Sequence, residues 1–417
     1  MTEPRTVPVW AGRMLALTGI VILALNLRTA VASLSPVLDE IGSDVPLTSV
    51  GIGILGTLPP VSFAVFGLLA PALARRIGLD LAMLLAVLAM VVGHLARGFA
   101  PNYPMLLASS ALVLAGVGIG NVLLPPAVKR YFPDRIGTLT AVSAALMSLS
   151  TAVPALLSAP LTATVTWRGD LAAWGVVALI ALGPWLALWL RERRAAADRR
   201  DAGTILPEGE HVTGLWRSPV AWACATVFAS SSFNAYALFA WLPQILSDTA
   251  GSDPFTAGAL LSLYGIAGLP AAILVPLIAV RIRNTGLLVY AGVAFFVVGY
   301  SGLLLAPATL TALWVVLAGF GPLLFPVALI LINIRSRSPR GSAALSGFTQ
   351  GIGYSVGATG PLLVGVTHQL TGSWTVPILL LLVMGLAALP AAVALARPRT
   401  VEDDLARIRS DREVVTR

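Results

Sequence analysis

The sequence alternates long apolar segments with short polar ones, and this pattern constrains the fold more than any other feature. A helix of about 20 apolar residues crosses the hydrocarbon core of a membrane, whereas a membrane strand needs only about 10. Segments of the longer kind predict helices, which satisfy their backbone hydrogen bonds internally. The twelve predicted spans lie near residues 14–38, 48–72, 80–98, 104–129, 137–162, 171–190, 217–246, 256–279, 285–305, 309–334, 342–366 and 374–396.

Composition supports a membrane protein and excludes a soluble one. Hydrophobic residues make up 57% of the chain, and charged residues make up only 11%. Soluble chains are about a quarter charged because their surfaces face water. Most of the outer surface is therefore expected to face lipid. The fold class predicted is an all-α polytopic membrane protein, with the lipid bilayer as a partner.

The basic residues indicate how the spans are oriented. Of the 27 lysines and arginines, 24 fall on one side of the predicted spans, Arg97 and Arg168 fall on the other, and Arg28 lies within a span. Because basic loops stay on the cytoplasmic side, we expect both termini in the cytoplasm of a multi-pass protein of the cytoplasmic (inner) membrane. The charges are spread over short loops, so no nucleic-acid partner is expected. The N-terminus lacks a small-residue cleavage site and predicts a retained first helix rather than a signal peptide.

Residues that hold metals or cofactors do not form a recognisable set. Cys224 is the single cysteine, and His94, His211 and His368 are scattered. No glycine-rich phosphate loop followed by Lys-Ser or Lys-Thr occurs, which argues against an ATP-driven pump. We expect no metal, no cofactor and no catalytic residues, and hence no enzyme.

One long polar stretch divides the predicted spans into two blocks of six. We predict an N-terminal bundle at 1–190, a cytoplasmic connector at 191–216, a C-terminal bundle at 217–396 and a cytoplasmic tail at 397–417. Two blocks of six spans could belong to a duplicated channel or to a transporter. The long connector between the blocks favours a transporter.

The two blocks resemble each other in sequence. Ser35-Pro36 in the first span matches Leu242-Pro243 in the seventh, and Ala115-Gly116-Val117-Gly118 in the fourth matches Ala318-Gly319-Phe320-Gly321 in the tenth. Two six-helix halves repeated in parallel are typical of the major facilitator fold, whose substrate site lies near mid-membrane between the halves.

Four stretches of sequence carry a resemblance to a known family. They are Asn26-Leu27-Arg28, GVGIGNVLLPPAVKRYFP at 116–133, Tyr236 followed by Trp241-Leu242-Pro243, and LSGFTQGIGYSVGATGPLLVG at 345–365. Together they resemble the cyanate and 2-nitroimidazole permease branch of the major facilitator superfamily. The resemblance implies a permease for a small polar or anionic solute. The chain departs from the pattern at Thr29, where the family usually has proline.

Arg28 is the strongest functional signal, because no other ionisable side chain lies near the centre of a predicted span. An arginine at mid-membrane costs about 2.5–3.5 kcal/mol on insertion scales, so such residues usually face a cavity. Its planar fork of donors suits a carboxylate, a cyanate or a nitro group. The alternative is a structural arginine that binds the carbonyls of a broken helix.

A polar stripe in the eleventh predicted span is the second signal. Ser346, Gln350 and Tyr354 recur every four residues, so they share one helix face. In lipid this face is expected to turn inward, where Gln350 and Tyr354 either donate to a substrate or bond to neighbouring helices.

Three further polar residues are candidate substrate contacts. Asn121 lies in the fourth predicted span, and Asn234 and Tyr236 lie mid-span in the seventh. The alternative for Asn234 is helix packing. His94, near the end of the third span, is expected to be a helix-end residue rather than a proton carrier.

The predicted function is secondary transport of a small anionic or dipolar solute by alternating access. The substrate-binding set comprises Arg28, Asn121, Asn234, Tyr236, Gln350 and Tyr354. An exporter of drugs or other xenobiotics is the alternative within transport. A membrane enzyme or sensor would need a reactive cluster or a soluble signalling domain, and neither is recognisable. The partners expected are a small-molecule substrate and lipid, and the protein is expected to be a monomer.

Overall fold

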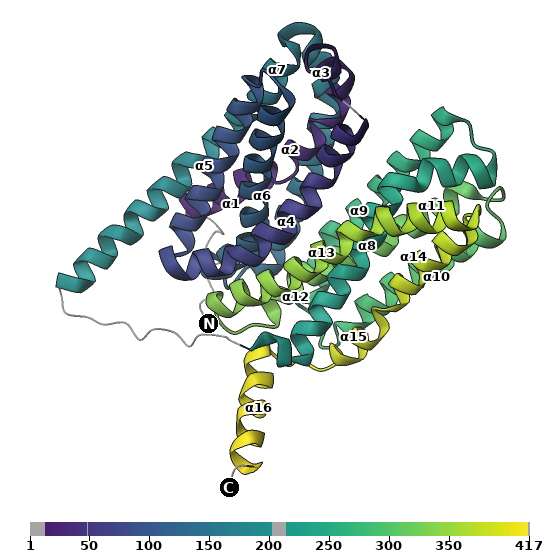
Figure 1. Cartoon of the computed structure of the whole chain (residues 1–417). Coiled ribbons are helices and arrows are strands. Elements are labelled where there is room, and N and C mark those ends of the chain that lie inside the picture. Colours follow the sequence, from purple (N-terminus) through teal and green to yellow (C-terminus); the bar gives the residue numbers. More distant parts are fainter. Residues whose placement is uncertain (1–12, 48, 202–213, 416–417) are drawn as a thin grey trace, which may run out of the picture. The chain divides into compact units, whose positions relative to one another are not determined.

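The regular structure consists of helices alone in the parts of the chain that the computed structural model describes, residues 13–47, 49–201 and 214–415 (Figure 1). The predicted all-α architecture is therefore confirmed. The chain divides into two compact units. Met1–Ser62 with Leu69–Glu210 form the first unit, and Phe63–Leu68 with His211–Arg417 form the second.

The first unit contains the helices that correspond to the first six predicted spans, except for Phe63–Leu68 of α4, which belong to the second unit. They are α1 (Met14–Asn26), α2 (Thr29–Ala32), the 3-10 turn η1 (Ser35–Val37), α3 (Leu38–Asp44), α4 (Ser49–Ile77), α5 (Leu79–Gly98), α6 (Tyr103–Tyr131) and α7 (Ile136–Asp201). The predicted first span is thus divided into α1 and the short α2. α4 and α6 continue through their internal prolines, as expected for membrane helices.

α7 joins the predicted fifth and sixth spans without a separate loop. Its 66 residues are helical except at Thr166, where φ is 63° and ψ is 165°. A threonine rarely adopts a positive φ, so this residue marks a sharp local bend. α7 also continues to Asp201, which makes the first part of the predicted connector 191–216 helical. Residues 202–213 of that connector lie outside the described ranges.

Close helix packing in the first unit depends on glycine. A Cβ at Gly116 of α6 would lie 2.4 Å from the carbonyl oxygen of Ala86 on α5, and a Cβ at Gly93 would lie 2.4 Å from a methyl of Val113. Any larger side chain would push α5 and α6 apart. Small residues at such contacts let membrane helices approach closely, and dispersion contacts then stabilise the pair.

The second unit contains the helices of the remaining predicted spans. They are η2 (Leu215–Arg217), α8 (Pro219–Ala250), α9 (Pro254–Ala279), α10 (Gly286–Leu305), α11 (Thr311–Phe320), η3 (Gly321–Leu323), α12 (Leu324–Ile334), α13 (Pro339–Thr371), α14 (Thr375–Leu386), α15 (Leu389–Ala394) and α16 (Val401–Val415). The predicted tenth span is divided by η3, which contains Pro322, and the predicted twelfth is divided into α14 and α15.

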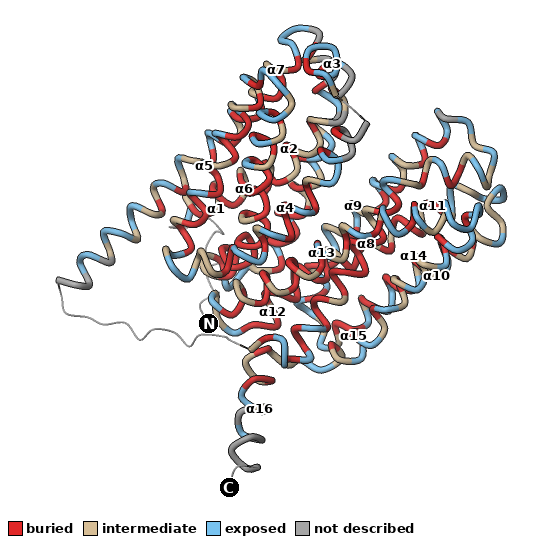
Figure 2. The backbone as a smooth tube through the Cα atoms, viewed as in Figure 1, coloured by how far each residue is buried: buried red, intermediate tan, exposed pale blue. Residues whose placement is uncertain are grey.

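α8 and α13 pack closely against each other in the second unit. A Cβ at Gly353 would lie 2.1 Å from the ring of Phe228, and a Cβ at Gly360 would lie 2.7 Å from the carbonyl oxygen of Phe233. Both helices carry long buried stretches (Figure 2). The glycines on one face of α13 therefore serve the same purpose as those of α5 and α6.

Eleven segments of the described chain are long and apolar enough to cross a membrane. α13 is not among them, although its 33 residues exceed the length required and match the predicted eleventh span. Glycines, serines and threonines recur along α13 and lower its mean hydropathy. These helices define a multi-pass membrane protein.

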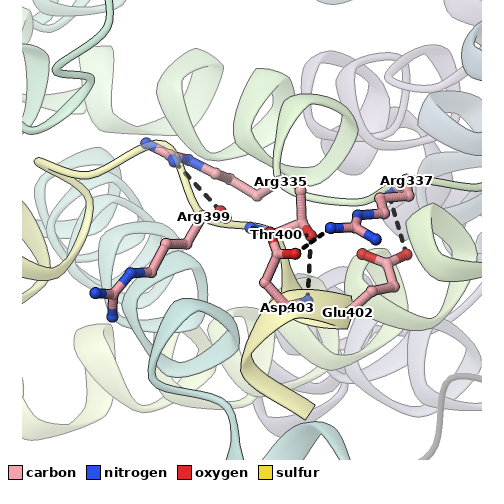
Figure 3. Close-up of polar contacts among 6 residues, drawn as sticks. All are labelled: Arg335, Arg337, Arg399, Thr400, Glu402 and Asp403. Atoms are coloured by element: carbon pink, nitrogen blue, oxygen red, sulfur yellow. Dashed lines mark hydrogen bonds and ion pairs between the residues drawn. The ribbon is translucent and has the colours of Figure 1, made fainter. Parts of the chain in front are cut away.

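The predicted tail at 397–417 contains a helix, α16, that is attached to the second unit. Thr400 and Asp403 form a capping box at its start, in which Asp403 accepts bonds from the Thr400 amide at 2.9 Å and hydroxyl at 2.8 Å. Arg337 forms an ion pair with Asp403, and its backbone amide donates to Glu402 at 2.9 Å (Figure 3). The start of α16 is thereby held by the loop between α12 and α13.

Arg335 bonds to the chain that leads into α16 at the same junction. Its side chain is buried, and its guanidinium donates to the carbonyls of Arg397 at 2.6 Å and Leu395 at 2.8 Å and to the Thr285 hydroxyl at 2.7 Å. Burial of Arg335 lowers its pKa. Hydropathy alone did not reveal this arrangement, because each contact joins residues far apart in the sequence.

Candidate functional site

Arg28 lies at the break in the first predicted span. Its backbone, with φ −127° and ψ −13°, departs from helical geometry between α1 and α2. The Arg28 carbonyl accepts the first bonds of α2, from the amides of Val31 at 3.1 Å and Ala32 at 3.0 Å. Its half-buried side chain donates from Nη1 to the Leu27 carbonyl at 3.4 Å, which is longer than a usual N–H···O bond.

Polar side chains stabilise the backbone around this break. The Asn26 amide nitrogen donates to the Ile22 carbonyl at 2.7 Å, and the Thr29 hydroxyl donates to the Asn26 carbonyl at 2.9 Å. Carbonyls at a break in a membrane helix need such partners, because lipid offers none. Proline at position 29 would lack this hydroxyl. The departure from the family pattern at Thr29 therefore supplies a local hydrogen bond.

Asn121 lies on α6, next to a residue that faces the break. It is buried, and a Cβ at the preceding Gly120 would lie 3.1 Å from a methyl of Leu27. The first unit thus brings the backbone at Asn121 close to the segment that carries Arg28.

Asn234 lies on α8 and bonds to another helix of the second unit. Its side chain is fully buried, its Nδ2 donates to the Ser230 carbonyl at 2.9 Å, and its Oδ1 accepts from the Tyr300 hydroxyl at 2.7 Å. Tyr300 comes from α10. These contacts show that Asn234 takes part in packing α8 against α10, and its contact with a substrate stays a prediction.

Tyr236, Gln350 and Tyr354 lie on the α8–α13 pair. Tyr236 is half-buried, and Gln350 donates to the hydroxyl of Ser346 at 2.9 Å. The Tyr354 ring packs edge-to-face on Phe228 with ring centroids 4.9 Å apart. Within the described residues the buried Tyr354 hydroxyl has no hydrogen-bond partner. Gln350 and Tyr354 are each 1% exposed, so neither lies on the outer surface.

The candidate residues fall into two sets, one in each unit. Arg28 and Asn121 belong to the first, and Asn234, Tyr236, Gln350 and Tyr354 belong to the second. The sequence did not reveal the roles of two buried polar residues. Arg97 bonds to the segment that follows Arg28, and Tyr300 bonds to Asn234. The charge pattern places Arg97 only on the side opposite most basic residues, whereas its position three residues after His94 indicates a shared helix face. No group of three His, Cys, Asp or Glu side chains in the described residues could hold a metal ion.

Solved structures of other proteins share this fold. The proton:xylose symporter XylE superposes with a TM-score of 0.66 at 13% sequence identity, over 95% of this chain and 98% of that one. At this identity the likeness shows the fold alone. The shared fold and the long apolar helices define a multi-pass, all-helical membrane protein.

The profile of the Major Facilitator Superfamily matches residues 16–358, and the chain therefore belongs to this family of secondary transporters. It is 34% identical over 379 residues to the uncharacterized transporter YycB of Bacillus subtilis (strain 168), covering 89% of this chain and 92% of that protein. It is 33% identical over 390 residues to the 2-nitroimidazole transporter of Escherichia coli (strain K12), covering 92% and 94%. It is 27% identical over 357 residues to the cyanate transport protein CynX of the same strain, covering 85% and 90%. The resemblance drawn from the sequence motifs is confirmed, and the family is one of transporters rather than enzymes.

Proposed function

We propose that this transporter moves a small anionic or strongly dipolar solute across the cytoplasmic membrane by alternating access, and that Arg28 binds the electronegative end of the solute. The class includes cyanate, nitroimidazoles and small carboxylates. The observation that carries the proposal is the position of Arg28 at the break in the first predicted span. Relatives named for 2-nitroimidazole and cyanate transport support the same class.

A second arginine contributes to the backbone at the break where Arg28 lies. The bond of Arg28 to the adjacent Leu27 carbonyl is 3.4 Å long, whereas Arg97 donates to the Ala30 carbonyl in the same segment at 2.9 Å. Arg97 therefore supplies a donor to a backbone carbonyl of the broken segment. A guanidinium fork matches two acceptor atoms of a carboxylate, a nitro group or a similar end.

Tyr354 is the best candidate contact in the second unit. Its hydroxyl is buried, and no protein group of the described residues bonds to it. A buried hydroxyl left without a partner is costly, so a solute that accepts from it would gain affinity. We include Asn121, Tyr236 and Gln350 as further contacts. Asn234 would join them by bonding to the solute in addition to its bond with Tyr300.

The first experiment identifies a ligand and then tests Arg28. Purified protein is screened by thermal shift with sodium cyanate, 2-nitroimidazole and sodium benzoate, because a ligand that prefers the folded state raises its melting temperature. Uptake of the stabilising compound is then measured in proteoliposomes. Arg28→Ala should abolish saturable uptake. Arg28→Lys should lower the affinity for the solute about tenfold or more, because lysine loses the second hydrogen bond of the planar fork.

The matched control is Arg281→Ala, which removes an exposed arginine outside the spans and should leave uptake unchanged. Failure of all three compounds to stabilise the protein would reject the proposed solute class. Unchanged affinity and rate in Arg28→Ala would show that Arg28 is structural.

The proposed orientation places both termini in the cytoplasm. Ser410 on α16 is exposed and Cys224 is buried, so Ser410→Cys in a Cys224→Ser background gives one accessible thiol. In intact cells a membrane-impermeant maleimide should leave this thiol unlabelled, and it should react after the membrane is opened. Labelling of intact cells would reverse the orientation.

A further inference from the structure

Arg97 is a buried cation that the proposed function does not use. It lies in the last turn of α5, and its side chain is 0% exposed. Burying a charged group costs free energy unless strong hydrogen bonds or charges compensate it. The contacts that compensate Arg97 therefore show what the residue holds in place.

Its guanidinium joins three helices of the first unit. Nε donates to the hydroxyl of Ser110 on α6, and Nη1 donates to the carbonyl of Ala30 on α2, each at 2.9 Å. Both distances are typical of good hydrogen bonds, and bonds from a charged donor are stronger than neutral ones. Arg97 thus fixes the position of α2 against α5 and α6.

The Ala30 carbonyl is a group that needs an outside donor. α2 has only four residues, Thr29–Ala32, and the last four carbonyls of a helix have no partner within it. Lipid cannot supply the donor. The long side chain of Arg97 reaches this carbonyl from a helix 67 residues further along the chain.

Arg28 is the residue that caps the same four-residue helix. Its carbonyl bonds to Val31 and Ala32, so the backbone at Arg28 moves with the backbone at Ala30. We propose that Arg97 is a positioning residue for Arg28. By donating to the Ala30 carbonyl, Arg97 fixes the direction in which the Arg28 side chain extends from the backbone between α1 and α2. This inference rests on the solute site proposed above.

A neighbouring buried residue provides a matched control. His94 lies one turn before Arg97 on α5, is also buried, and donates from Nδ1 to the Leu171 carbonyl on α7 at 3.1 Å. This bond links the same end of α5 to α7 rather than to α2. His94→Gln should lower thermal stability without changing the affinity for the solute.

The test is a double-mutant cycle on the affinity for the compound that stabilises the wild-type protein in the thermal-shift screen. Arg97→Gln removes the charge and the fork, and it should weaken binding about fivefold or more, within the range of couplings between neighbouring residues. Arg97→Lys keeps one donor and the charge and should restore part of the affinity. In an Arg28→Lys background, Arg97→Gln should cause little further loss, because the group that it positions is already impaired.

Two results would overturn the inference while the proposed function stands. One is unchanged affinity in Arg97→Gln, and the other is a loss that adds in full to the loss caused by Arg28→Lys. If Arg97→Gln does not fold, the same cycle is measured with Arg97→Lys or with Ser110→Ala, which removes the acceptor of Nε. The same two outcomes then test the inference. Unchanged affinity in Arg28→Lys and Arg28→Ala would instead reject the proposed function itself, so the two failures are separable.

Discussion

The carboxylate of Asp404 accepts a hydrogen bond from the hydroxyl of Ser218 at 2.7 Å, which joins α16 to the start of α8 across 186 residues. The same oxygen accepts from the Val220 amide at 3.1 Å, and Ser218 in turn caps α8 by accepting from the Ala221 amide. Asp404 is buried at this junction. An acidic side chain here also complements the positive end of the α8 dipole.

Removal of the Asp404 carboxylate should detach α16. Asp404→Ala leaves buried donors of α8 without their acceptor, at a cost of about 1–3 kcal/mol. A spin label at Ser410→Cys, in a Cys224→Ser background, should become more mobile in the electron paramagnetic resonance spectrum. Arg407→Gln, an exposed change on the same helix, is the control. An immobile label in Asp404→Ala would show that the other contacts hold α16 alone.

Acid should release the same helix through Asp403. The Thr400 amide and hydroxyl and the Arg337 guanidinium hold the pKa of Asp403 below its usual value of about 3.9. A carboxyl whose pKa is lower in the folded state stabilises that state above its usual pKa, and this contribution disappears as the pH falls through the folded-state pKa. The spin label at Ser410→Cys should therefore become mobile only below about pH 4. Asp403→Asn should abolish this acid step, and an unaltered step in that variant would assign it to another group.

A methyl group at Gly116 should disturb the packing of the first unit. Gly116→Ala would place Cβ 2.4 Å from the Ala86 carbonyl oxygen, which belongs to the backbone and cannot rotate away. Such overpacking typically costs about 1–3 kcal/mol, so the melting temperature in detergent should fall. Gly183→Ala is the matched control on α7, because its new Cβ meets no atom within 4 Å beyond its chain neighbours and the adjacent backbone of its own helix. Equal melting temperatures for the two variants would contradict the close approach of α5 and α6.

Tyr300→Phe should separate the two interpretations of Asn234. The change leaves Oδ1 of the buried Asn234 without its donor and should cost about 1–3 kcal/mol of stability. If Asn234 serves packing alone, the half-saturation concentration for uptake in proteoliposomes should stay unchanged. An increase in that concentration would retain Asn234 as a substrate contact.

The fold class was predictable because hydropathy is summed over long segments. Apart from α13, each predicted span contains a segment that is long and apolar enough to be recognised. Arg28 stood out for the same reason, as a charge within an apolar segment. The bond from Arg97 to Ala30 and the bond from Tyr300 to Asn234 could not be predicted in this way. Each depends on how two distant helices are rotated and shifted against each other, and one sequence does not contain that register. α16 was missed because its polar sequence forms a helix only with a capping box and partners on other segments.

The low hydropathy of α13 has a consequence for how the chain is made. Helices leave the translocation channel for lipid according to their own transfer free energy, and glycines and polar residues weaken that drive. α13 buries its small-residue face against α8, which is synthesised earlier. We expect stable insertion of α13 to depend on its contact with α8, so that a bulky substitution at Gly353 or Gly360 should lower the amount of correctly inserted protein and not only the stability of the folded protein.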